Sequence, residues 1–221
     1  MKDLRFMKED YISRLLVYLP KGRKFFEIGA GYGNFTVKLA EISQRVRAFE
    51  TNKVLYKILL KKASKLKNVE VFNEDAFKHK PEPDEIVFTD LPFSKSRKFL
   101  IWLVENTINE VYAIVQAEFF SKIAAKPSDR SYSGLSVIFN HFFEYRKLLD
   151  VPSEAYVPKP KVHATFFYAK RIRDCALGKD KISLVLKRMT KRFEKSRIDP
   201  SRKVFELSPE EVMREVGIQT C

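Results

Sequence analysis

An alternation of short β-rich runs with segments of helical periodicity begins at residue 24, and it constrains the fold more than any other feature of this chain. The pattern is typical of a parallel sheet whose strands are joined by crossover helices. Successive strands are predicted at KFFEI (24–28), RVRAFE (45–50), VEVF (69–72), EIVFTD (85–90) and EVYAIVQ (110–116), with an antiparallel edge pair at 142–149 and 162–170. The sequence therefore predicts an α/β, Rossmann-like fold with a mostly parallel seven-stranded sheet and flanking helices.

The balance of charge limits the classes of partner. Lys and Arg number 42 against 28 Asp and Glu, which gives a net charge of +14. A surface this basic attracts polyanions, so nucleic acid or an anionic membrane face is favoured over a small anionic metabolite. The segment 1–20 is charged up to Asp10 and has only a short apolar stretch, which predicts neither a signal peptide nor a membrane anchor. We expect a cytoplasmic protein.

Cysteine and histidine spacing gives no sign of a metal site. Cys175 and Cys221 lie far apart and form no CxxC pair, and His79, His141 and His163 have no mutual spacing that suggests ligation. The sequence therefore predicts two reduced thiols and no metal.

A glycine-rich turn follows the first predicted strand and runs into a helical segment. Its glycines, Gly29, Gly31 and Gly33, let the backbone approach a ligand closely, although many nucleotide-binding proteins share such a turn. Glu27 precedes the turn and argues against a dinucleotide, because its carboxylate would repel a pyrophosphate. The sulfonium and α-amino group of S-adenosylmethionine are cationic and would be favoured there.

Two further acids follow the next two strands. Glu50 ends the second strand about twenty residues beyond the glycines, where a carboxylate can accept both hydroxyls of a ribose. Asp75, followed by Ala76, comes after the third strand and is placed for the amino group of a base. Together with the glycine turn, these acids predict a site for S-adenosylmethionine.

The tetrapeptide Asp90-Leu91-Pro92-Phe93 ends the fourth strand and has the residue types that methylation of an exocyclic amine requires. Such an amine is a poor nucleophile, because its lone pair is delocalised into the ring. The Asp90 carboxylate and the Leu91 carbonyl can accept its N–H bonds. Pro92 makes the turn rigid, and Phe93 offers a face on which a flipped-out base can stack. Asp90 is also expected to face the cofactor.

The last part of the chain differs from the rest in composition. Between Lys170 and Lys203 thirteen Lys or Arg residues stand against four Asp or Glu, and a second short helix is predicted at SPEEVMREV with Ser208 as its N-cap. We predict two domains, a cofactor-binding catalytic domain over 1–172 and a small basic helical domain over 173–221. A further helix near 53–67 has a lysine-rich face.

Most of residues 4–170 resemble the rRNA adenine dimethyltransferase family of the KsgA and Erm type. The matching pieces are FFEIGAGYGNFT, Glu50, EDAF, the tetrapeptide at 90–93, QAEFFSKIAAKP (116–127), YSGLSV (132–137) and VPSEAYVPKPKV (151–162). The last piece is the most specific. The resemblance implies an S-adenosylmethionine-dependent methyltransferase of class I fold that acts on ribosomal RNA or a pre-ribosomal subunit, expected to be the small one.

Three departures from the family pattern concern the target. The family usually has Asn-Leu-Pro-Tyr at 90–93, it usually has Gln-x-Phe-Leu where this chain has Leu4-Arg5-Phe6-Met7, and its C-terminal domain is larger. The Gln-x-Phe-Leu segment helps to close over the cofactor in the family, so the resemblance implies that Arg5 and Met7 line the pocket here.

The alternatives differ in the base and in whether catalysis is retained. Adenine N6 is favoured, but cytosine N4 presents the same amine beside a ring nitrogen. An RNA-binding assembly or transcription factor that has lost catalysis is a second alternative, disfavoured by the intact Glu50, Asp75 and glycines. A small-molecule methyltransferase is disfavoured by the charge. We expect a monomer.

Overall fold

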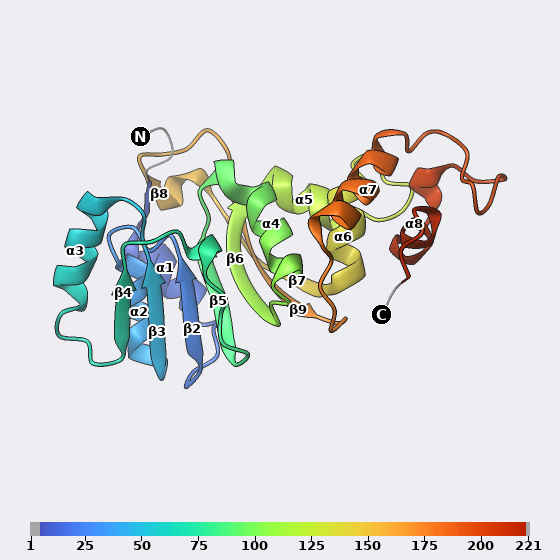
Figure 1. The fold of residues 1–221 in the computed structure, drawn as a ribbon. Helices are drawn as coiled ribbons and strands as arrows, with labels where there is room; N and C mark the ends of the chain where they lie inside the picture. The colour runs from blue at the N-terminus through green and yellow to red at the C-terminus, as the bar shows by residue number, and fades with distance from the viewer. Residues whose placement is uncertain (1–4, 220–221) are drawn as a thin grey trace. The chain divides into compact units, whose positions relative to one another are not determined.

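The computed structural model describes residues 5–219 and contains a seven-stranded sheet in the order β4-β3-β2-β5-β6-β9-β7 (Figure 1). The strands are β2 (Lys24–Ile28), β3 (Arg45–Phe49), β4 (Val69–Phe72), β5 (Glu85–Asp90), β6 (Glu110–Gln116), β7 (Phe143–Val151) and β9 (Ala164–Arg171). The predicted Rossmann-like fold is confirmed. β2 pairs in parallel with β3 and β5, β3 with β4, and β5 with β6, and the last two predicted strands occupy the edge beyond β6.

The central strands are apolar because helices cover them. In β5, Ile86, Val87 and Phe88 are completely buried in succession, as expected for a parallel strand with both faces covered. Helices α1 (Glu9–Leu16) and α2 (Asn34–Ile42) contact each other, and α2 contacts β3. Figure 1 shows both helices behind this part of the sheet.

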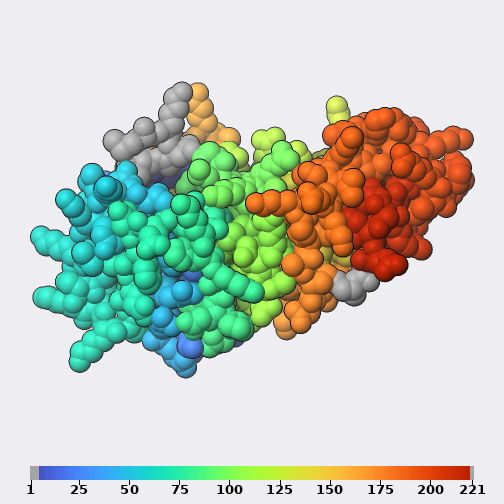
Figure 2. Space-filling model, viewed as in Figure 1, coloured from blue at the N-terminus to red at the C-terminus, as the bar shows by residue number. Residues whose placement is uncertain are grey.

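Helix α3 (Lys53–Ala63) begins at a polar cap and has two distinct faces. The Asn52 side chain accepts hydrogen bonds from Val54 N and Leu55 N at the start of the helix. Its apolar face packs on β4, whereas its lysines are exposed. The predicted helix near 53–67 is therefore present and ends earlier. Figure 2 shows side chains of this cyan-to-teal segment projecting at the left.

Contacts group the described residues into two compact units. The first comprises 5–96, 108–117 and 145–169, and the second comprises 97–107, 118–144 and 170–219. The C-terminal segment thus shares its unit with two earlier segments of the chain. The prediction that 173–221 forms a separate domain stays a prediction.

The second unit is helical. Its helices are α4 (Ser96–Glu105), α5 (Ala117–Ala124), α6 (Gly134–Phe142), α7 (Lys179–Thr190) and α8 (Pro209–Glu215). Both α7 and α8 pack on α6. Gly134 allows the close approach of α7, since a Cβ there would lie 2.8 Å from Leu186 Cδ2. The predicted cap is confirmed, because Ser208 Oγ accepts a hydrogen bond from Glu211 N.

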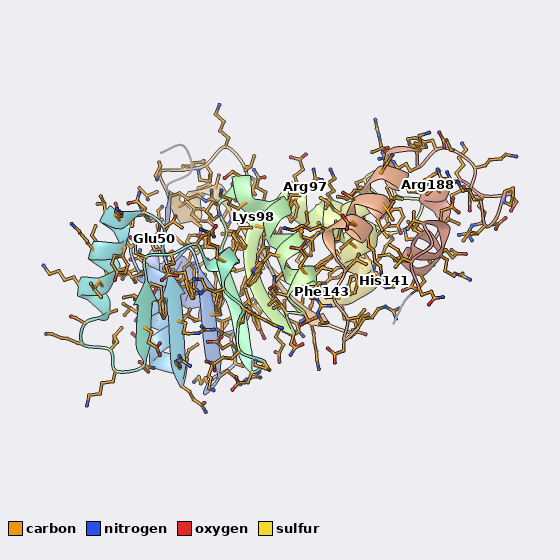
Figure 3. All side chains as sticks on the ribbon, viewed as in Figure 1. Glu50, Arg97, Lys98, His141, Phe143 and Arg188 are labelled. Atoms are coloured by element: carbon orange, nitrogen blue, oxygen red, sulfur yellow. The ribbon has the colours of Figure 1, made fainter. Side chains whose placement is uncertain are left out.

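A buried carboxylate organises the loop between α7 and α8. Glu215 Oε1 accepts hydrogen bonds from Arg188 Nε at 3.0 Å and Nη2 at 2.8 Å, and Oε2 accepts one from Ser196 Oγ at 2.8 Å. Both oxygens also accept from Arg197 N, and Oε2 from Ile198 N. Figure 3 labels Arg188 on α7. This pair therefore holds the loop in one conformation.

Two observations bear on the expectations about cysteine and membrane. Cys175 is disulfide-bonded, so the prediction of a reduced thiol there is wrong, and Cys221 lies outside the described residues. Spacing alone could not reveal this bond, because disulfide formation depends on distance in the fold. Within residues 5–219 no helix is both long and apolar enough to cross a bilayer.

Candidate functional site

The glycine-rich turn lies between β2 and α2, as predicted. At its glycines the backbone carries no side chain, and the turn lies at the carboxyl ends of the parallel strands. Gly29 and Gly31 have φ angles of +72° and +58°, which residues with a Cβ rarely adopt. Gly33 is the N-cap of α2, and a Cβ there would lie 2.7 Å from Leu59 Cδ1 of α3. In open α/β sheets this edge is where ligands bind.

Glu50 follows β3, and two backbone amides fix its carboxylate. Oε2 accepts a hydrogen bond from Gly31 N at 2.9 Å, and Oε1 accepts one from Asn52 N at 2.7 Å. Each oxygen can accept a further hydrogen bond. Figure 3 labels Glu50 beside the start of α3. The carboxylate lines a cavity of about 260 Å³, together with Gly29, Gly31 and Pro92 among others. It is therefore oriented to bind a ligand with hydroxyl groups.

Glu27 lies beneath the glycine turn and lines a smaller cavity of about 60 Å³, which Met7 also lines. Burial raises the pKa of its carboxyl to about 7, the Thr36 hydroxyl opposes this shift by donating to Oε2 at 2.6 Å, and the Glu50 charge adds to it. The repulsion between the two carboxylates means that a cationic ligand would stabilise this site.

Asp90 ends β5 and lines both cavities. Burial raises the pKa of its carboxyl to about 6, while the positive charge of Arg5 and a hydrogen bond from Tyr156 oppose the shift. The Tyr156 hydroxyl donates to Oδ1 at 3.1 Å. The carboxyl is thus buried, oriented and ready to accept a proton or a hydrogen bond near neutral pH.

The tetrapeptide leaves the sheet after Leu91. Leu91 is completely buried, and its N–H donates to Ile114 O of β6 at 3.0 Å. Phe93 begins the 3₁₀ helix η2 (Phe93–Lys95). The structure therefore brings Asp90 to the wall of both cavities, whereas Leu91 and Phe93 line neither of them. The Leu91 carbonyl accepts a hydrogen bond from Arg5 Nη2 at 3.1 Å.

The family model for ribosomal RNA adenine dimethylases matches residues 16–193, which is most of the chain. This chain belongs to the ribosomal RNA adenine dimethylase family. Ribosomal RNA small subunit methyltransferase A of Thermotoga neapolitana is 31% identical over 224 residues, which cover 94% of this chain and 86% of that protein. Its namesake in Thermotoga petrophila is 34% identical over 170 residues, which cover 75% of this chain and 65% of that protein.

One solved structure has the same fold as this chain, although the two sequences have low identity. A dimethyladenosine transferase from Plasmodium falciparum superposes with a TM-score of 0.81 at 16% identity and covers 97% of this chain and 99% of its own. At this identity the likeness establishes the fold alone. The fold is that of class I methyltransferases, with the predicted site at the carboxyl edge of the sheet.

Not all predicted cofactor residues of this dimethylase line the two cavities. Asp75 is the N-cap of the 3₁₀ helix η1 (Ala76–Lys78), and its side chain accepts a hydrogen bond from Phe77 N at 3.1 Å. Neither Asp75 nor Ala76 lines either cavity, so their predicted contact with the adenine of the cofactor stays a prediction. Gly33 lines neither cavity and instead packs toward α3.

Sequence reasoning assigned no site role to Tyr156. It reaches the site through a short antiparallel sheet of β1 (Phe6–Met7) and β8 (Tyr156–Val157), in which Met7 pairs with Tyr156. The available signal was the piece VPSEAYVPKPKV (151–162) of the family resemblance, in which Tyr156 carries a hydroxyl group.

Within 5–219 no three His, Cys, Asp or Glu side chains gather as ligands for a metal ion. The site consists of carboxylates, backbone amides and aromatic rings.

Proposed function

We propose that this chain transfers methyl groups from S-adenosylmethionine to the exocyclic amine of an adenine in ribosomal RNA, with the small subunit as the favoured source. The observation that carries the proposal is the position of Asp90 at the wall of a cavity that Glu50 also lines, with Leu91, Pro92 and Phe93 directly after it in the chain. Family membership supports the reaction class, and two relatives bear the name ribosomal RNA small subunit methyltransferase A.

The residues fit the cofactor by charge and by donor type. Glu50, held by two amides, would accept the hydroxyls of the ribose. Glu27 and Asp90 lie where a cation would be stabilised, because burial disfavours their own ionisation. When bound, S-adenosylmethionine supplies a methyl group activated by a positively charged sulfonium.

The protein's part in the reaction is to orient and polarise the amine. Asp90 and the Leu91 carbonyl would accept the two N–H bonds, which draws the nitrogen out of conjugation with the ring. The phenyl ring of Phe93 would hold the base by stacking. Tyr156 fixes the Asp90 carboxylate through Oδ1 and leaves Oδ2 available for the amine. The amine loses a proton after transfer, and the Asp90 carboxylate can accept that proton.

The surface of each unit supports an RNA partner. In the first unit, α3 exposes Lys53, Lys57 and Lys61 on one side. In the second unit, the loop between α7 and α8, which Glu215 holds by hydrogen bonds, exposes Lys195, Arg197 and Lys203. Such basic faces bind phosphates and release counterions. We further expect the protein to act as a cytoplasmic monomer, without metal or membrane.

Methylation of unmodified rRNA tests the proposal. Purified protein is incubated with methyl-labelled S-adenosylmethionine and rRNA from a strain lacking this gene, and the nucleosides are identified by mass spectrometry. Labelled N6-methylated adenosine, single or double, supports the proposal. Labelled N4-methylcytidine would keep the mechanism and change the base. No label above an Asp90→Ala control would overturn the proposal and favour the RNA-binding factor.

A further inference from the structure

The side chain of Arg5 lies against the face and the acceptor that the proposed function assigns to the target base. Its guanidinium carbon is 3.4 Å from the centroid of the Phe93 ring, a stacking distance. Its Nη2 donates a hydrogen bond to Leu91 O at 3.1 Å. The Tyr156 ring is 5.2 Å away on another side. Arg5 therefore makes the stacking contact and one of the two amine contacts expected of the base.

A guanidinium resembles an amine-bearing base in the features that this site would recognise. It is planar, it stacks on aromatic rings, and it presents N–H donors at its edge. The likeness is incomplete, because Arg5 Nε is buried and has no hydrogen-bond partner among the described residues. An unsatisfied buried donor costs free energy, so the position is held by the stacking and by the Leu91 contact, and it can be vacated.

The backbone next to Arg5 is anchored, which keeps the side chain at the site. Phe6 and Met7 pair with Val157 and Tyr156, and Lys8 N donates to Ala155 O at 2.8 Å. Arg5 thus immediately precedes a two-residue strand. The side chain can swing out while β1 stays paired.

We propose that Arg5 is a specificity-determining residue that occupies the target-base site and that an incoming base must displace. The inference rests on the proposed function. A competing occupant weakens the apparent affinity for any base by the fraction of molecules in which the site is open. A base within folded rRNA brings phosphates that can pair with the displaced guanidinium, whereas a base in a short single strand brings few. Arg5 would therefore select against bases outside the structured target.

The test compares two substrates and three variants at saturating S-adenosylmethionine. Arg5→Ala removes the side chain that occupies the site. Arg5→Lys keeps the positive charge but lacks the planar guanidinium and its paired N–H donors. Arg14→Ala is the matched control, because Arg14 is an exposed arginine of α1 in the same unit. We measure kcat/KM on a short oligoadenylate and on unmodified rRNA, with melting temperatures to verify folding.

We expect Arg5→Ala and Arg5→Lys to raise the ratio of kcat/KM on the oligoadenylate to kcat/KM on rRNA by about tenfold, since one desolvated cation–π contact accounts for about that factor. Effects of Arg5 on Asp90 or on the cofactor act on both substrates alike and cancel in this ratio. Arg14→Ala should not change the ratio. Equal losses on both substrates would overturn the proposal, because Arg5 would then hold the substrate. If Arg5→Lys keeps the wild-type kcat/KM while Arg5→Ala changes it, the positive charge of Arg5 and not its planar shape is responsible. That result would also overturn the proposal.

A binding measurement separates this inference from the proposed function. Adenosine is titrated by ligand-observed NMR with S-adenosylhomocysteine saturating the cofactor cavity. Arg5→Ala should bind adenosine about tenfold more tightly than the wild type, and adding Phe93→Ala should remove the gain. This outcome can hold even if rRNA is not methylated, in which case only the proposed function fails. Unchanged adenosine affinity in a folded Arg5→Ala protein would refute the inference.

Discussion

Replacing Asp90 tests the proposed chemistry most directly, because its carboxyl is buried, oriented and shared by both cavities. Asp90→Ala removes the acceptor, and Asp90→Asn keeps a carbonyl oxygen and removes the charge while restoring the usual residue of the family. Tyr156→Phe removes only the hydroxyl that donates to Oδ1. These three variants distinguish three roles of the Asp90 carboxylate: accepting a hydrogen bond, supplying a negative charge, and being held in one orientation by Tyr156.

The pKa of Asp90 gives the expected size of the effect of its charge on the methylation rate. Burial is the main cause that raises the pKa of Asp90 from 3.8 to about 6, and a shift of about two units corresponds to about 3 kcal/mol. Positive charge that develops on the amine can recover up to that amount in the transition state, which is a rate factor of roughly 10². Asp90→Ala should therefore lower the single-turnover rate by roughly 10²–10³, the range for deleting one transition-state hydrogen-bond partner. If charge dominates, Asp90→Asn should lose about as much.

The direction of the pKa shift of Asp90 predicts how the methylation rate changes with pH. The folded-state pKa of Asp90 lies above its usual value, so the carboxyl gains its proton as pH falls through about 6. Single-turnover rates of the wild type should fall below about pH 6, or lower with the cationic cofactor bound. Tyr156→Phe removes a hydrogen bond that lowers this pKa, so its rate should begin to fall at higher pH.

The assay is rapid-quench methylation of rRNA at saturating protein and cofactor, with RNA affinity measured separately. RNA affinity should stay nearly unchanged in all three variants, since the acceptors act on the chemical step. Full activity in Asp90→Ala would refute the reasoning, and so would an acid limb that survives in Asp90→Asn.

Three further predictions follow from the described contacts. Glu50→Ala should weaken S-adenosylmethionine binding by about 1.5–3 kcal/mol in calorimetry, the range for hydrogen bonds to a charged acceptor, and unchanged affinity would remove Glu50 from the site. The pKa of Glu27 is about 7 and a cationic ligand favours the ionised form, so cofactor affinity should fall as pH drops below 7, and Glu27→Gln should weaken this dependence and leave the part due to Asp90, whose pKa is about 6. Glu215→Ala should lower the free energy of unfolding by about 3–5 kcal/mol, because it removes the buried carboxylate that Arg188 Nε and Nη2 contact and leaves the exposed Glu194 as the remaining carboxylate partner of Arg188; an unchanged denaturation midpoint would contradict this.

The fold and the cofactor side of the site could be predicted because their signals are local in sequence. A parallel strand covered on both faces is a continuous apolar run, as in β5. The carboxyl ends of neighbouring parallel strands meet at one edge, so the glycine turn, Glu50 and Asp90 come together once the strands are recognised. The extent of α3 was less predictable, because its helical periodicity continues beyond Ala63, where the helix ends.

The target side of the site could not be predicted in the same way, because it depends on a two-residue pairing. The β1–β8 sheet joins segments about 150 residues apart, and a run of two residues gives no periodic signal. Yet this pairing brings both Arg5 and Tyr156 to Asp90. A buried carboxylate is stabilised by a nearby cation as well as by hydrogen-bond donors, whereas the neutral Asn usual in the family needs hydrogen-bond partners but no cation. The acid at position 90, the hydroxyl of Tyr156 and the charge of Arg5 therefore form one electrostatic unit, and a change at any of the three should alter the effect of changes at the others.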